Sequence, residues 1–115
     1  MLLDNTFWEN EENKITLLEL LNVSYHLPEK HISLNLLKPH LLSWQNIEEM
    51  SKIELVDLKY PILILVDDKE KILSILDGHH RTYKAISLGL KTIKAKLITI
   101  NSLPPEFKSI FSPTA

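Results

Sequence analysis

The sequence has no cysteine, only two glycines and a single arginine among its 115 residues. The lack of cysteine excludes disulfides and thiolate metal ligands, and it favours a reducing compartment such as the cytoplasm. No apolar run approaches the length that spans a bilayer, and the acidic start of the chain is unlike the basic start of a signal peptide. We therefore expect a cytoplasmic protein with no membrane segment.

The chain also lacks a strong excess of positive or negative charge. Thirteen basic and fifteen acidic residues give a formal net charge of -2, which excludes the global positive field of a non-specific nucleic-acid binder. Nucleic-acid binding would need a local patch, for which Lys91, Lys94 and Lys96 are the candidates. Alternate lysines are also typical of an edge strand protected against aggregation, and we favour that interpretation.

The length and the hydrophobic content of 44% are sufficient for one domain with its own core. Residues 1–13 are polar and acidic apart from Phe7 and Trp8, so we expect a loosely ordered arm, with the single domain over residues 14–115. Residues 14–21 fit either a short strand leading into a helix or one helix. Within residues 32–42, Pro39 predicts a short helix before Lys38 and a new turn after it.

The pattern becomes clearer from residue 61 onward. Residues 62–66 form an apolar run typical of a strand buried on both faces, and residues 71–76 predict a second strand returning beside it. Residues 79–88 predict a helix that ends at Gly89, and residues 92–99 alternate as a half-exposed strand does. We therefore expect a small α+β domain: a mixed β-sheet with a hairpin, a helix after it and flanking short helices.

Rare residues gather at the start of that helix, in the sequence Asp77-Gly78-His79-His80-Arg81. A strand that ends in Asp-Gly and enters a helix directs backbone N–H groups toward an anion, and an arginine fork suits phosphate or carboxylate. This pattern predicts phosphate binding by six residues: Gly78, His79, His80, Arg81, Thr82 and Lys84. The alternative is that Asp77 caps the helix and Arg81 pairs with a surface carboxylate.

The segment Ile75-Leu76-Asp77-Gly78-His79-His80-Arg81-Thr82-Tyr83-Lys84-Ala85-Ile86, with Gly89 after it, resembles the signature of the ParB/sulfiredoxin-like superfamily. The resemblance covers residues 53–100 and implies a hairpin that feeds a Gly-x-x-Arg turn and a helix. Members bind nucleotides with this turn, and the Asp-Gly-His-His-Arg form is most similar to free-serine kinases and to small phage and bacterial proteins. The resemblance implies ATP, ADP or CTP as ligand, Mg²⁺ for phosphoryl transfer, and catalytic roles for Asp77 and His80.

The chain also departs from that superfamily. The early His-Glu pair of kinase-like members has its nearest counterpart at His40, which leucine follows, and the sulfiredoxin cysteine is absent. Enzyme status, as a phosphotransferase or NTPase, therefore stays open. A second interpretation is a non-catalytic accessory or inhibitory protein, such as a phage-borne one, whose turn recognises a partner or a nucleic-acid phosphate. The apolar tail, Phe107 to Phe111, would then be a candidate docking element. A third interpretation is a DNA-binding domain.

Other residues are weaker candidates. The spacing of His26, His31 and His40 matches no familiar metal motif, so no metal site is predicted from them. Glu48, Glu49 and Glu54 could supply a catalytic carboxylate, although a solvated helix face explains them better. Trp44 could stack on a base, but packing against the hairpin is the favoured role.

Overall fold

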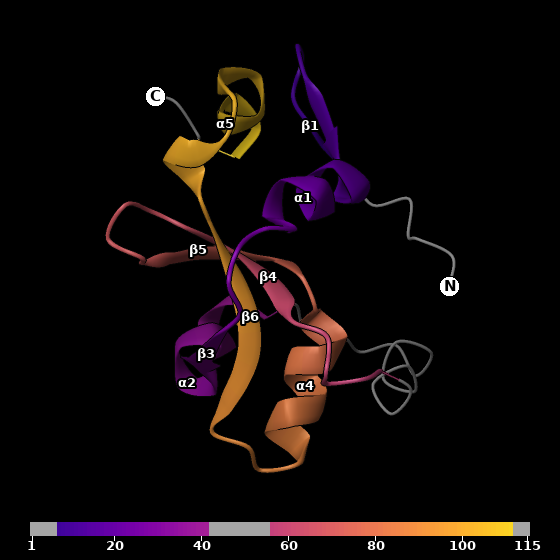
Figure 1. The fold of residues 1–115 in the computed structure, drawn as a ribbon, viewed down its shortest axis with the longest axis vertical. Helices are drawn as coiled ribbons and strands as arrows, with labels where there is room; N and C mark the ends of the chain where they lie inside the picture. The colour runs from indigo at the N-terminus through magenta and orange to yellow at the C-terminus, as the bar shows by residue number, and fades with distance from the viewer. Residues whose placement is uncertain (1–6, 42–55, 112–115) are drawn as a thin grey trace.

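The computed structural model describes residues 7–41 and 56–111 of the chain. They form two sheets with helices packed on them (Figure 1). Strands β1 (Phe7–Glu9) and β2 (Lys14–Thr16) make an antiparallel pair, and strands β3 (Lys30–Ser33), β6 (Thr92–Thr99), β4 (Ile62–Val66) and β5 (Ile72–Asp77) make a four-stranded sheet in that order. The domain is therefore α+β with a mixed sheet, as the sequence predicts.

Strand β4 lies inside the four-stranded sheet and is buried along its whole length. Its alternate side chains enter two separate cores. Leu63 and Leu65 join the core under helices α1 (Leu17–Ser24) and α5 (Pro105–Phe111), while Ile62, Ile64 and Val66 join the core under α2 (Leu34–Leu37) and α4 (His79–Ser87). The prediction of a strand buried on both faces is confirmed.

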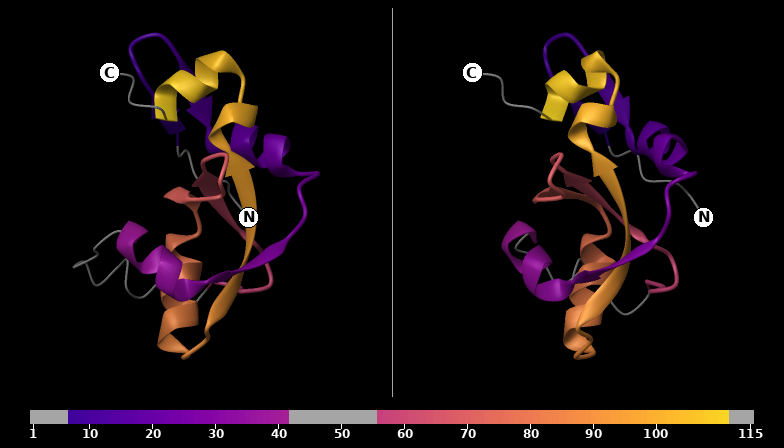
Figure 2. Two further views of the ribbon diagram at one scale, coloured as in Figure 1. Left: turned by 90° about the vertical axis from the view of Figure 1, so that its left-hand side faces the viewer. Right: turned by 60° about the vertical axis from the view of Figure 1, so that its left-hand side comes forward.

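Strand β6 pairs with β3 on one side, antiparallel, and with β4 on the other, parallel. Figure 2 shows it running the length of the molecule between the two groups of helices. The expectation of an edge strand is therefore wrong. Lys94 and Lys96 lie on one face of a central strand, and the Lys96 ammonium donates to the backbone oxygens of Ser24 and Tyr25.

The N-terminal part of the structure settles whether residues 14–21 are a helix or a strand followed by a helix, and it shows a strand within the expected arm. Residues 14–21 are a strand leading into a helix: Thr16 ends β2 and begins α1 in a capping box with Glu19, whose N–H donates to the Thr16 hydroxyl over 3.1 Å. Residues 7–9 of the expected arm form β1, and Trp8 packs on the first core and against Phe111, with ring centroids 5.8 Å apart. Residues 1–6 lie outside the described residues.

The rest of the chain follows the predictions more closely. A short helix, α2, does precede Lys38, and the 3-10 turn η1 (Lys38–His40) holds Pro39, but the preceding strand β3 was not expected. After β6, the turn η3 (Ile100–Ser102) leads to α5, whose Phe107, Ile110 and Phe111 pack on the first core. The tail residues considered for partner docking thus contribute to the fold. No helix in the described ranges is long and apolar enough to cross a membrane.

Candidate functional site at the start of helix α4

Gly78 connects β5 to α4 in a conformation that only glycine adopts readily. Its φ is +112°, and a Cβ built there would lie 2.6 Å from the Cβ of Ile62. The backbone of Gly78 thus lies close to strand β4, which fixes the turn against the sheet, while phosphate binding at Gly78 stays a prediction.

Arg81 holds the same turn from the other side. Its Nη1 donates to the carbonyl oxygens of Tyr60 (3.1 Å) and Pro61 (2.8 Å), and its Nη2 donates to Asp77 Oδ2 over 2.9 Å. The Arg81 side chain is only 15% exposed. Because three of the five guanidinium N–H donors are used here, the fork joins the segment before β4 to the start of α4.

Asp77 does not cap the helix, so that expectation is wrong. The N-cap is Gly78, which has no side chain to cap α4. The Asp77 carboxylate is instead one turn away from Arg81 in sequence and forms the i,i+4 ion pair with it. Of the alternative in which Asp77 caps the helix and Arg81 pairs with a carboxylate, only the pairing of Arg81 with a carboxylate is found.

Thr82 and Lys84 also direct their polar groups into the protein. Thr82 is fully buried, and its hydroxyl donates to the Gly78 carbonyl oxygen over 2.8 Å. The Lys84 ammonium donates to the Val56 carbonyl oxygen over 2.7 Å. Both residues therefore stabilise the turn and its attachment to the segment before β4, and phosphate binding by their side chains stays a prediction.

His79 and His80 occupy the first turn of α4, and both are half-buried. Burial lowers the pKa of His79 below its usual value; the charge of His80 acts in the same direction, while a backbone hydrogen bond with Ile75 and the Asp77 carboxylate act against it. His79 is therefore a neutral imidazole at neutral pH. In that form it has one N–H donor and one acceptor nitrogen.

The lowered pKa of His79 predicts a pH dependence of stability. The unfolded chain binds the His79 proton more readily than the native protein, so its contribution is complete above the usual pKa of about 6.5 and is lost as the pH falls toward the lower native pKa. In urea titrations between pH 7.5 and 5, wild type should lose more stability than His79→Gln. His26→Gln, at an exposed histidine, should retain the wild-type pH profile. Parallel profiles for wild type and His79→Gln would contradict this prediction.

The remaining candidates are dispersed. His31 lies on β3, His40 on η1 and His26 in the exposed turn after α1. In the part of the chain that the structure describes, no three His, Asp or Glu side chains are grouped to hold a metal ion. Trp44, Glu48, Glu49 and Glu54, the other residues considered from the sequence, lie outside the described residues.

The sequence did not reveal which residues accept hydrogen bonds from the motif. The carbonyl oxygens of Val56, Tyr60 and Pro61 accept hydrogen bonds from Lys84 and Arg81, but every residue type has a backbone carbonyl, so residue type does not identify such acceptors. The only available signal was the proximity of Tyr60 and Pro61 to the buried strand that follows them. The fold and the site together define a small α+β domain whose Asp-Gly-His-His-Arg turn joins a hairpin to a helix.

Comparison with known proteins finds no family model, no curated protein and no solved structure that matches this chain.

Proposed function

We propose that the domain binds the phosphate groups of a nucleotide, or of a phosphorylated small molecule, at the start of α4. The observation that supports this most is that α4, a nine-residue helix, begins at Gly78, a residue with no side chain of its own to cap the helix, and has two histidines as its first residues. Backbone N–H groups and the helix dipole favour an anion at such an end. His80 would add a side-chain donor. His79 would act through its backbone N–H, because the one imidazole N–H of its neutral form already bonds to Ile75, and Arg81 would act mainly by fixing the turn.

The order of elements agrees with the resemblance on which the choice of ligand depends. A hairpin (β4 and β5), the Gly-x-x-Arg turn, the helix α4 and the strand β6 follow one another, as in the ParB/sulfiredoxin-like superfamily. Membership of that superfamily is part of the proposal, as is a cytoplasmic location. The nucleotides it favours are ATP, ADP and CTP.

Phosphotransferase or NTPase activity is a further step that this proposal leaves open. Mg²⁺ commonly binds through substrate phosphates and one or two carboxylates, and Asp77 is the carboxylate at this turn. One Asp77 oxygen, Oδ2, already accepts from Arg81, so Asp77 fits as a single ligand beside the phosphates. In that form of the proposal, Asp77 would hold the ion and His80 would exchange a proton with the acceptor.

The test is calorimetric titration with ATP, ADP, CTP and GTP, with and without Mg²⁺, followed by a hydrolysis assay with each nucleotide that binds. We expect saturable binding by wild type, at least a tenfold loss in the double variant His79→Ala/His80→Ala, and unchanged affinity in His26→Ala. Inorganic phosphate should compete if the phosphates carry the binding.

Absence of binding to every nucleotide by folded wild type would overturn the proposal, as would equal affinity of the double variant. A non-catalytic interaction module would then be the better interpretation. One observation already favours it: the polar groups of Arg81, Thr82 and Lys84 are used inside the domain. DNA binding, the third interpretation, would require salt-sensitive binding of DNA that persists without nucleotide.

A further inference from the structure

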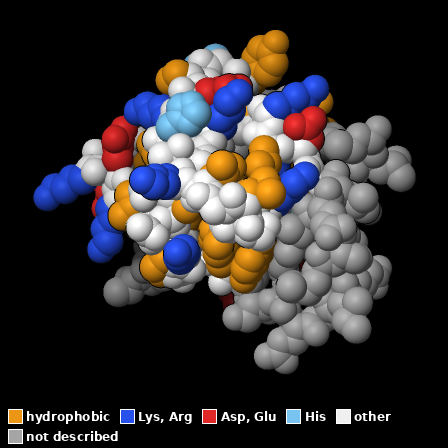
Figure 3. Space-filling model, turned by 90° about the horizontal axis from the view of Figure 1, so that it is seen from below, with side chains coloured by type: hydrophobic (Ala, Val, Ile, Leu, Met, Phe, Trp, Pro, Cys, Tyr) orange, Lys and Arg blue, Asp and Glu red, His pale blue; other side chains and the backbone are white. Residues whose placement is uncertain are grey.

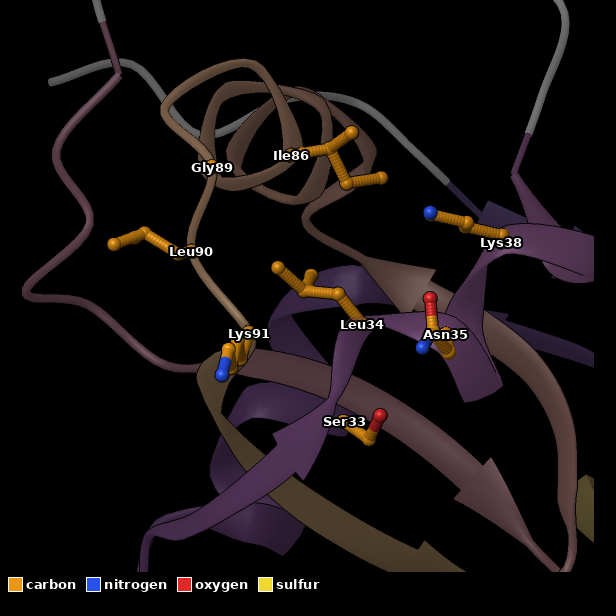
Figure 4. A pocket seen from close by; sticks show the side chains of 8 residues that line it. All are labelled: Ser33, Leu34, Asn35, Lys38, Ile86, Gly89, Leu90 and Lys91. Carbon is orange, nitrogen blue, oxygen red and sulfur yellow. The ribbon is translucent and has the colours of Figure 1, made fainter.

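A pocket of about 410 Å³ lies at the opposite end of α4, between α2 and the connection from α4 to β6. Its volume falls in the range of small-molecule sites. Leu34, Ile86 and Leu90 supply its apolar lining, and Lys38, Lys91 and Asn35 are among its polar residues. Figure 4 shows the Leu34 side chain between Ile86 and Leu90, with the two lysines on opposite sides of it.

Backbone pairing holds the two walls of this pocket together. Gly89, with φ +75°, ends α4 in a Schellman motif in which its N–H donates to Ile86 O and that of Leu90 donates to Ala85 O. The chain then turns toward α2, and the N–H of Leu34 donates to the Lys91 carbonyl oxygen over 2.9 Å. The pocket is therefore built into the junction of β3, α2 and β6.

The charged residues of the described ranges that line the pocket all have one sign. They are Lys38 and Lys91, with no Asp or Glu among them. Neither lysine forms an ion pair with a residue of the described ranges, and both are exposed. Figure 3, which views the molecule from the end where α4 passes to β6, shows hydrophobic side chains exposed among Lys and Arg side chains.

The apolar lining is partly open to a ligand. Leu34 forms the floor and is 3% exposed, whereas Leu90 is 47% exposed at the rim. Ile86 is half-buried and packs against the second core. A ligand can thus cover leucine and isoleucine surface while its charged end meets an ammonium group.

We propose that this pocket binds a small molecule that joins an anionic group to an apolar body, such as a medium-chain carboxylate. The apolar body would lie on Leu34, Ile86 and Leu90, and the anionic group would pair with Lys38 or Lys91. The nine residues of α4 span about 14 Å, so this pocket and the start of α4 are separate sites. The proposal does not depend on nucleotide binding.

The test is an NMR titration of the full chain, labelled with ¹⁵N, with octanoate, octanol and inorganic phosphate as probes. Octanoate should give saturable shifts in the amides of residues 33–38 and 86–92. Octanol lacks the charge and phosphate lacks the apolar body, so each should bind at least roughly fivefold more weakly. No saturable shift at these residues with octanoate, or equal affinity for octanol, would overturn the proposal.

Variants separate the two parts of the recognition. Lys38→Met/Lys91→Met should weaken octanoate binding by roughly five- to tenfold, while Lys69→Met, at an exposed lysine of the β4–β5 turn, should leave it unchanged. Leu90→Asp should abolish binding, and Leu18→Asp, at an exposed leucine of α1, should not. Both leucines are exposed, so neither change is expected to unfold the domain. Wild-type affinity in the double lysine variant or in Leu90→Asp would contradict the assignment.

Discussion

Gly78→Ala is expected to destabilise the domain by roughly 2–5 kcal/mol, the largest effect of any single substitution proposed for this protein. Two costs combine at this position. The backbone φ of +112° is unfavourable for any residue with a Cβ, and the new methyl group would collide with the Ile62 side chain on β4. Relief of the collision requires the turn to move away from the sheet. The free energy of unfolding from urea titrations measures the loss.

Gly89→Ala is the matched control, because it separates backbone strain from the collision. Gly89 also has a positive φ, +75°, but a Cβ there would have no atom within 4 Å. Only the cost of the left-handed conformation remains, about 1–2 kcal/mol. Equal losses in the two variants would show that contact with Ile62 contributes nothing, contrary to this structure.

Arg81→Ala is expected to cost about 3 kcal/mol, because it removes three hydrogen bonds and leaves partly buried acceptors behind. The carbonyl oxygens of Tyr60 and Pro61 would lose their charged donor, and Asp77 would lose its ion-pair partner. Arg81→Lys retains the charge without the fork and should lose an intermediate amount. Urea titration again measures the effect.

The control for Arg81 is an exposed ion pair. Lys59 Nζ lies 3.9 Å from Asp57 Oδ2, and both side chains are more than half exposed. Lys59→Ala should therefore change the free energy of unfolding by less than about 0.5 kcal/mol. A similarly small change in Arg81→Ala would show that the guanidinium does not anchor the turn. It would also restore Arg81 as a candidate ligand for phosphate, since the side chain would then be able to move at little cost.

The elements that the sequence predicted well are those defined by local pattern. Strand β4 has five consecutive apolar residues, and α4 has an apolar spacing that ends at a glycine, so neither needs knowledge of its neighbours. Strand β3 has the sequence Lys-His-Ile-Ser, which carries no strong alternation, and it is defined by its pairing with β6 some sixty residues later. The place of β6 inside the sheet was mistaken for the same reason, because alternation reports which side chains are exposed but not which strands lie alongside.

The candidate site shows a similar division. Its location between a strand and a helix followed from Asp77 and Gly78, and the structure has that strand and that helix. The direction in which each polar group points did not follow. Arg81 and Lys84 reach backbone oxygens of residues 56–61, which residue types cannot reveal, and Asp77 pairs with Arg81 while Gly78 is the N-cap.

The central position of β4 has a consequence for the order in which the domain assembles. Its two partners, β5 and β6, and the helix between them all come from the uninterrupted stretch 62–99, so their contacts close short loops. Strand β3 joins β6 from much farther away along the chain, and α1 reaches its core from farther still. Because closure of long loops costs more entropy, we expect residues 62–99 to form the folding nucleus and the N-terminal third to dock onto it afterwards. The Asp-Gly-His-His-Arg turn would then be among the first parts of this protein to acquire its native shape.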